Sequence, residues 1–563
     1  MKVLIVGGVA GGATAAARLR RLDEEAEIIV FERSGYVSYA NCGLPYYIGG
    51  SIQDPDALTL QTPGSFLTRF RITMKVHHEV TAIHPERHTV SVKNLENGET
   101  FEESYDKLLL SPGARPTQPR LPGVGLEKVF TLRTVEDTFR IKSYIQEARP
   151  RSVVLAGGGF ISLELAENLR ALGLEVTIVQ RPRQLMNPFD PDLAAFLHGE
   201  VRRNGVQLAL GHTVEGFEEK DGGVDVLLAG EAPLHADMVV LAIGVTPDTG
   251  LAKEAGLTLG LKDSIVVNER METSAPDIYA VGDAVQVKHA VTGQDAHIPL
   301  AGPANKQGRV AADNICGGDS RYLGSQGSSI LKIFSLTAAA TGINETAAKK
   351  AGLDVDKVIL SPMSHAGYYP GGKVMTMKVV FEKGSYRLLG AQIVGYDGVD
   401  KRIDVLATAI HAGMKATELK DLDLAYAPPF SSAKDPVNMA GFMIDNLARK
   451  VVGQFGIDEI DRLPRDGSVT LLDARTPMEY SHGHVEGFRN IPVDVLREHL
   501  DEIQPGKPVY VMCQSGIRSY IAARILEGHG FTCYNFTGGF RYYDAVTHER
   551  RLIESAFDCG MDR

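Results

Sequence analysis

The chain has 563 residues, more than one hydrophobic core usually organises, so we expect roughly three or four domains. A hydrophobic fraction of 44% and a charged fraction of 23% are close to globular averages and argue against long disordered tracts. The net charge of −11 disfavours nucleic acid or an anionic membrane as a general partner.

Cysteine content and hydropathy bear on the compartment. Five cysteines are few and odd in number for this length, which is unlike the disulfide framework of a secreted protein. No uninterrupted apolar run reaches about eighteen residues, so we expect no membrane span. These features predict a cytoplasmic protein in a reducing environment.

The chain begins with a pattern typical of a dinucleotide-binding fold. A short apolar strand at 3–6 runs into a glycine-rich turn, and a helix is predicted at 13–21. Glycines here would let a pyrophosphate approach the free amides at the positive end of the helix. The next strand, 28–31, ends in an acid about twenty residues beyond the glycines, where a ribose hydroxyl is usually bound. Val9 replaces the middle glycine of the usual pattern, so a glycine-rich turn in another parallel sheet is the alternative. The predicted contacts to this dinucleotide are Gly7, Gly8, Gly11, Gly12 and Glu32.

A second copy of the pattern begins near residue 150, and two such folds predict two dinucleotides. A strand at 153–156 leads into a glycine turn and a helix at 163–172, and the strand at 176–179 ends in Gln180 and Arg181. A carboxylate there would favour the free ribose of NAD, whereas a neutral residue followed by arginine tolerates a 2′-phosphate. We therefore expect use of both NADH and NADPH. The predicted contacts are Gly157, Gly159, Phe160, Ile161 and Gln180.

Between these two folds lies Cys42, in the stretch SYANCGLPY. Asn41 and Gly43 beside it describe a polar turn in which amide donors could stabilise a thiolate that a ligand can reach. The residue five positions on is Tyr47, so a second cysteine for a self-contained redox disulfide is absent. Cys42 must therefore find its sulfur partner on another molecule. A lone cysteine is more often a small buried hydrophobe, which is the alternative.

Three further apolar segments, at 108–114, 239–247 and 277–284, each end in a turn. The first two indicate buried strands that enter glycine turns near a nucleotide. The third places an acid after a strand, where it could accept a hydrogen bond from a ribitol hydroxyl. Each segment alone is more often structural. The residues singled out are Gly113, Gly244 and Asp283.

In this order the motifs resemble the pyridine nucleotide-disulfide oxidoreductase family over about residues 1–450. Within that family the chain looks most like the coenzyme A disulfide reductases, through SYANCGLPYYIGG with one redox cysteine, PLAGPANKQGRVAADNI at 299–315, GYYPG at 367–371 and DLDLAYAPP beyond. The resemblance implies FAD and NAD(P)H as cofactors, Ala301 as a further cofactor contact, a homodimer, and a mixed disulfide between Cys42 and coenzyme A.

The same resemblance implies a coenzyme A site. Residues matching Arg18 and Arg21 contact its phosphates, and tyrosines matching Tyr368 and Tyr426 reach in from the other subunit. The two arginines lie three apart, so they share a face of the predicted helix that could meet phosphates. A solvated basic face is the alternative, and the tyrosines alone would be core or interface aromatics. The other implied contacts are Thr14, Ser38 and Asn41.

A second candidate centre lies near the C-terminus. A strand at 509–512 runs into Cys513, and a helix is predicted from Tyr520. Backbone amides, the positive helix end and Arg518 would lower the pKa of the Cys513 thiol and hold an anionic sulfur adduct. The segment resembles a single rhodanese domain, through DAR at 473–475, GHV at 483–485, the CxxGxRS loop and GGF at 538–540. The predicted loop residues are Gln514, Ser515, Gly516, Ile517 and Arg518.

A phosphatase loop is the competing interpretation of CxxGxRS, but it usually has five residues between cysteine and arginine, whereas four intervene here. The remaining cysteines, Cys316, Cys533 and Cys559, have no comparable setting and are predicted to be structural.

The predicted fold class is α/β, with two Rossmann-like dinucleotide-binding domains, an α+β dimerisation domain and an α/β rhodanese domain. The expected boundaries are an FAD-binding domain at 1–115 and 236–322, a connection at 116–149, an NAD(P)H-binding domain at 150–235, a dimerisation domain at 323–446, a linker at 447–463 and the rhodanese domain at 464–563.

The favoured function is a homodimeric flavoenzyme in which NAD(P)H, through FAD and Cys42, reduces the sulfur–sulfur bond of coenzyme A persulfide, coenzyme A disulfide or polysulfide. Cys513 would carry sulfane sulfur as a persulfide. One alternative is an NAD(P)H oxidase in which Cys42 cycles through a sulfenic acid. The other is a sulfur-carrier or redox-sensing protein. We expect neither a metal nor nucleic acid in any of them.

Overall fold

The computed structural model describes residues 1–558 and has the predicted mixed α/β character. It divides into two compact units: the first contains residues 1–183 and 205–327, and the second contains residues 184–204 and the chain from Ser328 onward. No helix among the described residues combines the length and the apolar character needed to cross a membrane.

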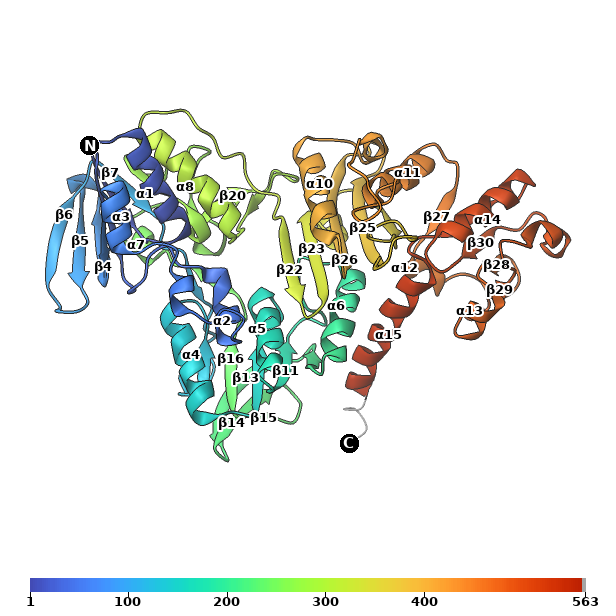
Figure 1. Cartoon of the computed structure of the whole chain (residues 1–563), viewed down its shortest axis with the longest axis horizontal. Coiled ribbons are helices and arrows are strands. Elements are labelled where there is room, and N and C mark those ends of the chain that lie inside the picture. The colour runs from blue at the N-terminus through green and yellow to red at the C-terminus, as the bar shows by residue number, and fades with distance from the viewer. Residues whose placement is uncertain (559–563) are drawn as a thin grey trace. The chain divides into compact units, whose positions relative to one another are not determined.

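The first unit contains a parallel five-stranded sheet built around the N-terminal strand. Val3, Leu4 and Ile5 are fully buried, as expected for strands of a parallel sheet that is covered on both faces. Helices α1 (Ala10–Leu22) and α8 (Ala301–Ile315) pack against each other beside it (Figure 1). In spatial order the strands are β19 (Ile278–Ala280), β7 (Lys107–Leu110), β1 (Lys2–Val6), β2 (Glu27–Glu32) and β3 (Thr73–Val76).

A second parallel sheet of the first unit carries the second glycine turn. Its central strand leads into helix α5 (Phe160–Ala171). The edge strand β9 and helix α4 (Val135–Ala148) both come from the stretch predicted as a connection, and β9 pairs with β16. In spatial order the strands are β12 (Gln207–Leu210), β11 (Glu175–Gln180), β10 (Ser152–Ala156), β16 (Met238–Leu241) and β9 (Val129–Thr131).

Smaller elements complete the first unit. Its short helices are α2 (Leu44–Ile48), α3 (Pro63–Phe70) and α7 (Gly250–Glu254). Its additional strands are β4 (His78–His84), β5 (Thr89–Asn94), β6 (Thr100–Ser104), β8 (Ala114–Pro116), β13 (Val214–Lys220), β14 (Gly223–Leu228), β15 (Leu234–Ala236), β17 (Val245–Pro247), β18 (Ile265–Val266), β20 (Val285–Lys288) and β21 (Asp295–Ala296).

The second unit begins with an antiparallel sheet, on which helix α10 (Val399–His411) packs against β23 and β26. Helices α9 (Glu345–Lys350) and α11 (Pro436–Ala448) also contact it through β24. In spatial order its strands are β22 (Ser329–Ile333), β23 (Leu336–Gly342), β26 (Leu388–Gly395), β25 (Met375–Glu382) and β24 (Val355–Leu360).

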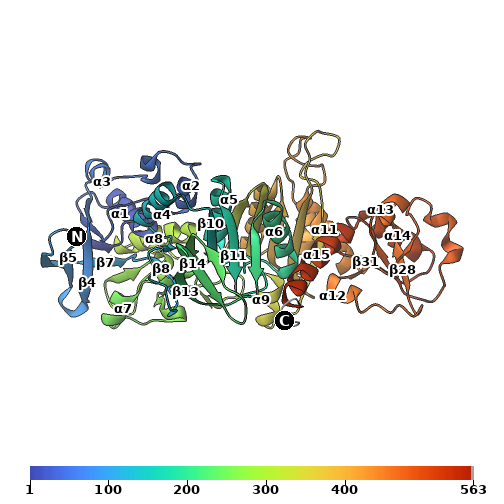
Figure 2. The same cartoon turned by 90° about the horizontal axis from the view of Figure 1, so that it is seen from below.

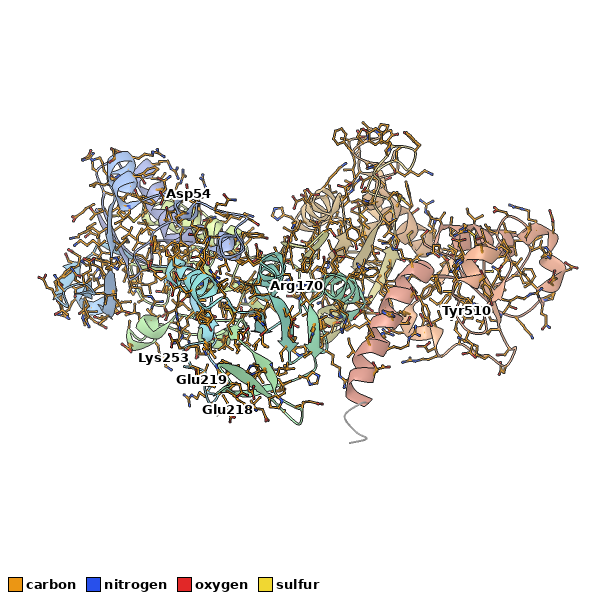
Figure 3. All side chains as sticks on the ribbon, turned by 60° about the horizontal axis from the view of Figure 1, so that its bottom comes forward. Asp54, Arg170, Glu218, Glu219, Lys253 and Tyr510 are labelled. Carbon is orange, nitrogen blue, oxygen red and sulfur yellow. The ribbon has the colours of Figure 1, made fainter. Side chains whose placement is uncertain are left out.

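The C-terminal part of the second unit is a parallel sheet with helix α14 (Ile517–Gly528) beside it (Figure 2). Tyr510, labelled in Figure 3, stacks on Tyr534 of the next strand at 4.9 Å between ring centroids. The strands in order are β27 (Gly453–Phe455), β31 (Cys533–Phe536), β30 (Val509–Met512), β28 (Thr470–Asp473) and β29 (Arg489–Asn490). The helices, besides α14, are α12 (Ile457–Ile460), α13 (Pro477–Ser481) and α15 (Gly539–Asp558).

Strand β27 lies inside the stretch predicted as a linker. It pairs in parallel with β31 from Gly453↔Tyr534 to Phe455↔Phe536, and Phe455 is buried. A three-residue edge strand is too short to show a recognisable periodicity in sequence. Its partner strand also lies about eighty residues away, so no local pattern joins the two. Three residues of the predicted linker therefore form an edge strand of the C-terminal sheet.

A buried ionic cluster explains why residues 184–204 belong to the second unit. The Lys378 ammonium on β25 lies 2.8 Å from a carboxylate oxygen of Asp192, 3.1 Å from Asp190 and 2.8 Å from Glu345. Asp192 belongs to helix α6 (Pro191–Arg203), which the sequence placed in the NAD(P)H-binding domain. Burial alone would lower the pKa of Lys378, but the three carboxylates more than offset burial and raise it.

Helix α15 joins the same cluster. The hydroxyl of fully buried Tyr542 donates to Asp192 Oδ2 at 2.6 Å. Just before α15 begins, Thr537 Oγ1 accepts a hydrogen bond from the amide of Ile359 on β24 at 2.8 Å. The antiparallel sheet, α6 and the C-terminal α/β part are thus held together by buried polar contacts within one unit.

Candidate active site

The first glycine turn has the backbone form that a dinucleotide requires. Gly7 has φ +97°, and a Cβ there would lie 2.1 Å from the carbonyl oxygen of Ser111. A Cβ on Gly12 would lie 1.9 Å from the Gly7 carbonyl oxygen. Helix α1 begins at Ala10, so Gly11 and Gly12 lie in its first turn. Only glycine fits this close approach of helix to strand.

Glu32 is placed at the end of β2 as predicted. Its carboxylate accepts from the amide of Gly8 and from the amide of Ser34, both at 2.9 Å. The acid is thereby fixed beside the glycine turn, where a ribose would lie above the strand ends. The turn and the acid together fit the pyrophosphate and ribose of FAD.

The second glycine turn repeats this form with one difference. Gly157 has φ +119°, and a Cβ there would lie 2.2 Å from the Ala242 carbonyl oxygen, whereas a Cβ on Gly159 would meet only open space. Phe160 and Ile161 open helix α5. Gln180 is the last residue of β11 and is half-buried, with Arg181 exposed after it. The site fits a second dinucleotide, and no acid at the end of β11 repels a 2′-phosphate.

The remaining predicted cofactor residues lie on turns of the first unit. Gly113 and Gly244 have positive φ, and Ala301 is the first residue of α8. The carboxylate of Asp283 pairs with Arg133 at 2.8 Å. Sequence reasoning missed Arg133, which has no motif of its own and lies 150 residues from its partner.

Cys42 lies in a short 3₁₀ turn, Asn41–Gly43, and is exposed. The amide of Ser38, a residue with φ +48°, donates to the Gly8 carbonyl at 2.8 Å and ties this turn to the first dinucleotide turn. The neighbouring amides of Asn41 and Gly43 donate to Tyr39 and Ala40 carbonyls. They are therefore consumed within the turn and do not stabilise a thiolate, contrary to the expectation from sequence.

Electrostatics around Cys42 also oppose the thiolate. Although solvent reaches the residue, partial burial raises the pKa of the thiol, and Glu164 and Asp283 raise it further, while Arg133 lowers it. Glu164 lies on α5, and burial together with Glu167 raises its own pKa to about 7. Glu164 was missed because it shows only as an ordinary helical glutamate four residues after Phe160.

Replacing Glu164 with glutamine is expected to lower the pKa of Cys42. Above pH 7 Glu164 is mainly ionised and disfavours the neighbouring thiolate, so its removal should shift the alkylation profile of Cys42 to lower pH. Iodoacetamide labelling between pH 6 and 10, followed by mass spectrometry, measures this shift. Glu167→Gln is the matched control: it leaves Glu164 in place and favours its ionised form, so it should not lower the pKa of Cys42. An unchanged or upward shift in Glu164→Gln would contradict the assignment.

The predicted coenzyme A residues fall into two groups. In the first unit, Thr14 Oγ1 donates to Asn305 Oδ1 at 2.8 Å, and Arg18 pairs with Asp313 at 2.7 Å, while Arg21 is exposed. In the second unit, the hydroxyls of Tyr368 and Tyr426 lie 2.7 Å apart on exposed loops, with 76% and 46% of these residues exposed. The structure thus pairs the two tyrosines with each other.

Cys513 begins the strand-to-helix turn between β30 and α14 and is fully buried. Its sulfur accepts from the amide of Gly516 at 3.1 Å and from the hydroxyl of Ser519 at 3.2 Å. Gly516 has φ +98°, and the amide of Phe540 closes the loop by donating to the Cys513 carbonyl at 2.7 Å. The hydrogen-bond donors to the Cys513 sulfur are therefore both uncharged groups. The sequence predicted backbone amides there, but not the Ser519 hydroxyl.

Arg518 lies beside this loop as expected, but its charge is paired with a carboxylate that the sequence did not reveal. Both of its terminal nitrogens donate to the Glu479 carboxylate at 2.7 Å. The second arginine nearby, Arg475, is buried and pairs with Asp473 at 2.7 Å. Its Nη1 also approaches the side chain of Gln514 at 3.4 Å. Ser515 and Ile517 complete the predicted loop, and Ile517 is exposed.

The other cysteines show no site of this kind among the described residues. Cys533 is buried, and burial raises the pKa of its thiol to about 12. Burial also raises the pKa of Cys316. Cys559 lies outside the described residues.

Comparison with known proteins matches three family models along the chain. Residues 1–308 match the pyridine nucleotide-disulphide oxidoreductase model, residues 328–436 the dimerisation domain of that family, and residues 457–545 the rhodanese-like domain. A coenzyme A disulfide reductase of Staphylococcus aureus (strain bovine RF122 / ET3-1) is 37% identical over 444 residues, which are 78% of this chain and 99% of that protein.

Solved structures extend the match over the C-terminal part. Reduced CoADR-RHD of Bacillus anthracis superposes with a TM-score of 0.95 at 47% identity, covering 98% of each chain. An NAD-dependent persulfide reductase from A. fulgidus gives 0.90 at 38% identity, covering 96% of this chain and 100% of the other. A water-forming NADH oxidase of Lactobacillus brevis gives 0.76 at 30% identity, covering 80% and 100%.

Proposed function

Because the chain belongs to the pyridine nucleotide-disulphide oxidoreductase family, we propose that it reduces the sulfur–sulfur bond of coenzyme A persulfide, coenzyme A disulfide or polysulfide at Cys42. It is a flavin-dependent enzyme that uses FAD and NAD(P)H and carries a rhodanese domain. The observation that carries the proposal is an exposed single cysteine whose turn is hydrogen-bonded to the first dinucleotide turn through Ser38 and Gly8.

The chemistry at Cys42 follows from its being alone. Its thiolate attacks one sulfur of the substrate, a Cys42–substrate disulfide forms, the original sulfur–sulfur bond breaks, and the second sulfur leaves as a thiolate or sulfide. FAD, when bound, supplies the two electrons of NAD(P)H that are needed to cleave the mixed disulfide. The attacked sulfur is then released as a thiol or a sulfide, and Cys42 returns to the thiolate. Arg133 opposes the carboxylates that disfavour this thiolate.

Coenzyme A is the proposed carrier of the sulfur. A coenzyme A disulfide reductase aligns over 78% of this chain, which supports coenzyme A as the carrier. Arg18, Arg21 and Thr14, the proposed coenzyme A contacts of the first unit, all lie on helix α1. The exposed pair Tyr368 and Tyr426 is proposed to reach the site of the other subunit in a homodimer, which the matched dimerisation domain supports. We also propose that both NADH and NADPH serve as electron donors. The enzyme is proposed to work in the cytoplasm, where its cysteine thiols stay reduced.

The test of the proposed function is a comparison of acceptors. Anaerobic NADH and NADPH oxidation should be fast with coenzyme A disulfide, coenzyme A persulfide or polysulfide. Oxygen should give slow turnover in a separate aerobic assay, although one structural neighbour is a water-forming NADH oxidase. Turnover with oxygen that exceeds turnover with every sulfur substrate would contradict the proposal.

Removal of the basic pair is expected to affect coenzyme A substrates selectively. Arg18→Ala with Arg21→Ala should raise the KM for coenzyme A disulfide about tenfold, because a charge-assisted phosphate contact contributes about 1.5–3 kcal/mol when desolvated and less when exposed. The KM for inorganic polysulfide should stay nearly constant. Arg87→Ala, which removes an exposed arginine paired with Glu102, is the control. Equal changes for both substrates would show that this helix face binds no coenzyme A.

A further inference from the structure

We propose that Glu479 sets the donor specificity of the Cys513 loop by neutralising Arg518, so that an organic persulfide is accepted in preference to thiosulfate. The inference rests on the further proposal, made from the sequence, that Cys513 of the rhodanese domain carries sulfane sulfur as a persulfide. It concerns which class of donor can load that sulfur.

The ion pair between Arg518 and Glu479 is bidentate and fixed from both sides. Two nitrogens of Arg518 donate to the two oxygens of Glu479, each at 2.7 Å. Glu479 also accepts from the amide and the hydroxyl of Thr476, at 3.0 and 2.9 Å, and so caps helix α13. Contacts from the cap and the arginine therefore hold the carboxylate in place, and an incoming anion has to displace it to reach Arg518.

The second arginine beside the loop is neutralised in the same way. Arg475 donates to Asp473 through Nε and Nη2, and both side chains are buried. The two arginines and two carboxylates carry equal positive and negative charge, so this group has no net charge. Sulfur at Cys513 instead receives its hydrogen bonds from the neutral Gly516 amide and Ser519 hydroxyl.

The neutral hydrogen-bond donors around the Cys513 sulfur favour an organic persulfide over thiosulfate as the source of sulfane sulfur. With an organic persulfide, RSSH, the Cys513 thiolate attacks the outer sulfur, a Cys513 sulfur–sulfur bond forms, the RS–S bond breaks, and RS⁻ leaves with the electron pair and takes a proton from water. Thiosulfate reacts by the same displacement but brings two negative charges and expels sulfite as a dianion. Neither reaction needs an oxidant or reductant. Because the two arginines beside the loop are both paired with carboxylates, the reaction with dianionic thiosulfate is the disfavoured one.

Three exposed apolar side chains on the two helices joined by this ion pair also favour an organic donor. Met478 on α13, and Ile517 and Ile521 on α14, are 69%, 52% and 43% exposed. Glu479 and Arg518, adjacent to Met478 and Ile517 in the chain, tie these two helices together. An aliphatic or amide-bearing stem of an organic persulfide can lie against such side chains, whereas thiosulfate has no apolar part.

The test measures persulfide on Cys513 of the full chain by mass spectrometry, after anaerobic incubation with cysteine persulfide or with thiosulfate. The unsubstituted protein should load faster from cysteine persulfide. Glu479→Gln frees Arg518 and should raise the rate from thiosulfate, relative to that from cysteine persulfide, by about tenfold, or about 1.4 kcal/mol. Glu479→Asp keeps a carboxylate at the helix cap with a shorter reach and should give a smaller gain in the same direction.

Three further variants make the result decisive. Adding Arg518→Met to Glu479→Gln should remove the gain. Glu527→Gln breaks another ion pair of α14, with Arg524, and should leave the donor ratio unchanged. Cys513→Ser gives the zero of the assay. An unchanged ratio in Glu479→Gln, or a gain that persists without Arg518, would overturn the specificity proposal. Absence of persulfide from either donor in the unsubstituted protein would instead overturn the proposed role of Cys513.

Discussion

Replacing Cys42 with serine is expected to abolish NAD(P)H-dependent reduction of coenzyme A disulfide, coenzyme A persulfide and polysulfide, while the protein keeps its FAD. A serine hydroxyl has nearly the shape of the thiol but cannot form the mixed disulfide on which each proposed reduction depends. Visible absorbance reports the bound flavin, and anaerobic NADH oxidation reports turnover.

Cys316→Ser is the matched control for this experiment, because that half-buried thiol has no role in the proposed cycle. Loading of sulfur on Cys513 should be unaffected by Cys42→Ser, since the loop around Cys513 is complete in itself. Sulfur reduction that survives in Cys42→Ser would show that electrons reach the substrate without a mixed disulfide at this residue.

Replacing Lys378 with methionine is expected to destabilise the second unit by about 3–5 kcal/mol. The ammonium group is shared by three carboxylates, those of Asp190, Asp192 and Glu345, and its removal leaves buried negative charge without its main partner. Hydrogen exchange of peptides from β25 and β26 measures the loss within the unit, which suits a multidomain chain better than one global melting temperature.

Lys383→Met removes a lysine at the end of the same hairpin and is the control. Its ion pair with Asp354 is more than half exposed, so the loss should stay below about 1 kcal/mol. Equal protection in the Lys378→Met and unsubstituted proteins would contradict the assigned role of the cluster.

The cluster also fixes the sign of a pH dependence. Burial alone would raise the pKa of Glu345, but Lys378 and Lys357 more than offset burial and hold it below its usual range. A carboxyl with a lowered pKa contributes stability above its unfolded pKa and loses it as the pH falls toward the folded value. The difference in free energy of unfolding between the Lys378→Met and unsubstituted proteins should therefore be largest at pH 7 and shrink below about pH 4.

The features predictable from sequence are those carried by contiguous residues. The glycine turns at Gly7 and Gly157 and the strand-to-helix turn at Cys513 each combine a short apolar strand, a turn and a helix within about twenty residues, and the structure has all three. The roles of the individual residues in binding remain predictions. The mixed α/β class followed because these local patterns recur in a fixed order.

The features missed join residues that are far apart in the chain. Glu164 acts on Cys42 across more than one hundred residues, and Glu479 meets Arg518 across 39. Each shows in sequence only as an ordinary surface glutamate. The prediction for Arg518 was incomplete for this reason: the loop shows the cation, and only the fold shows its counterion.

The hydrogen bond from Tyr542 to Asp192 has a consequence for transferring the C-terminal domain to another protein. The Staphylococcus protein that matches this chain is covered over 99% of its own length by an alignment of 444 residues, so it ends near where the rhodanese segment begins here. In this chain the phenol of Tyr542, from the C-terminal domain, donates to a carboxylate of the charged cluster around Lys378. A chimaera that moves the domain onto another reductase would have to transplant its acidic acceptor as well, or leave a phenol hydroxyl buried without a partner. The rhodanese-like match at residues 457–545 therefore does not by itself mark a segment whose buried contacts are all internal.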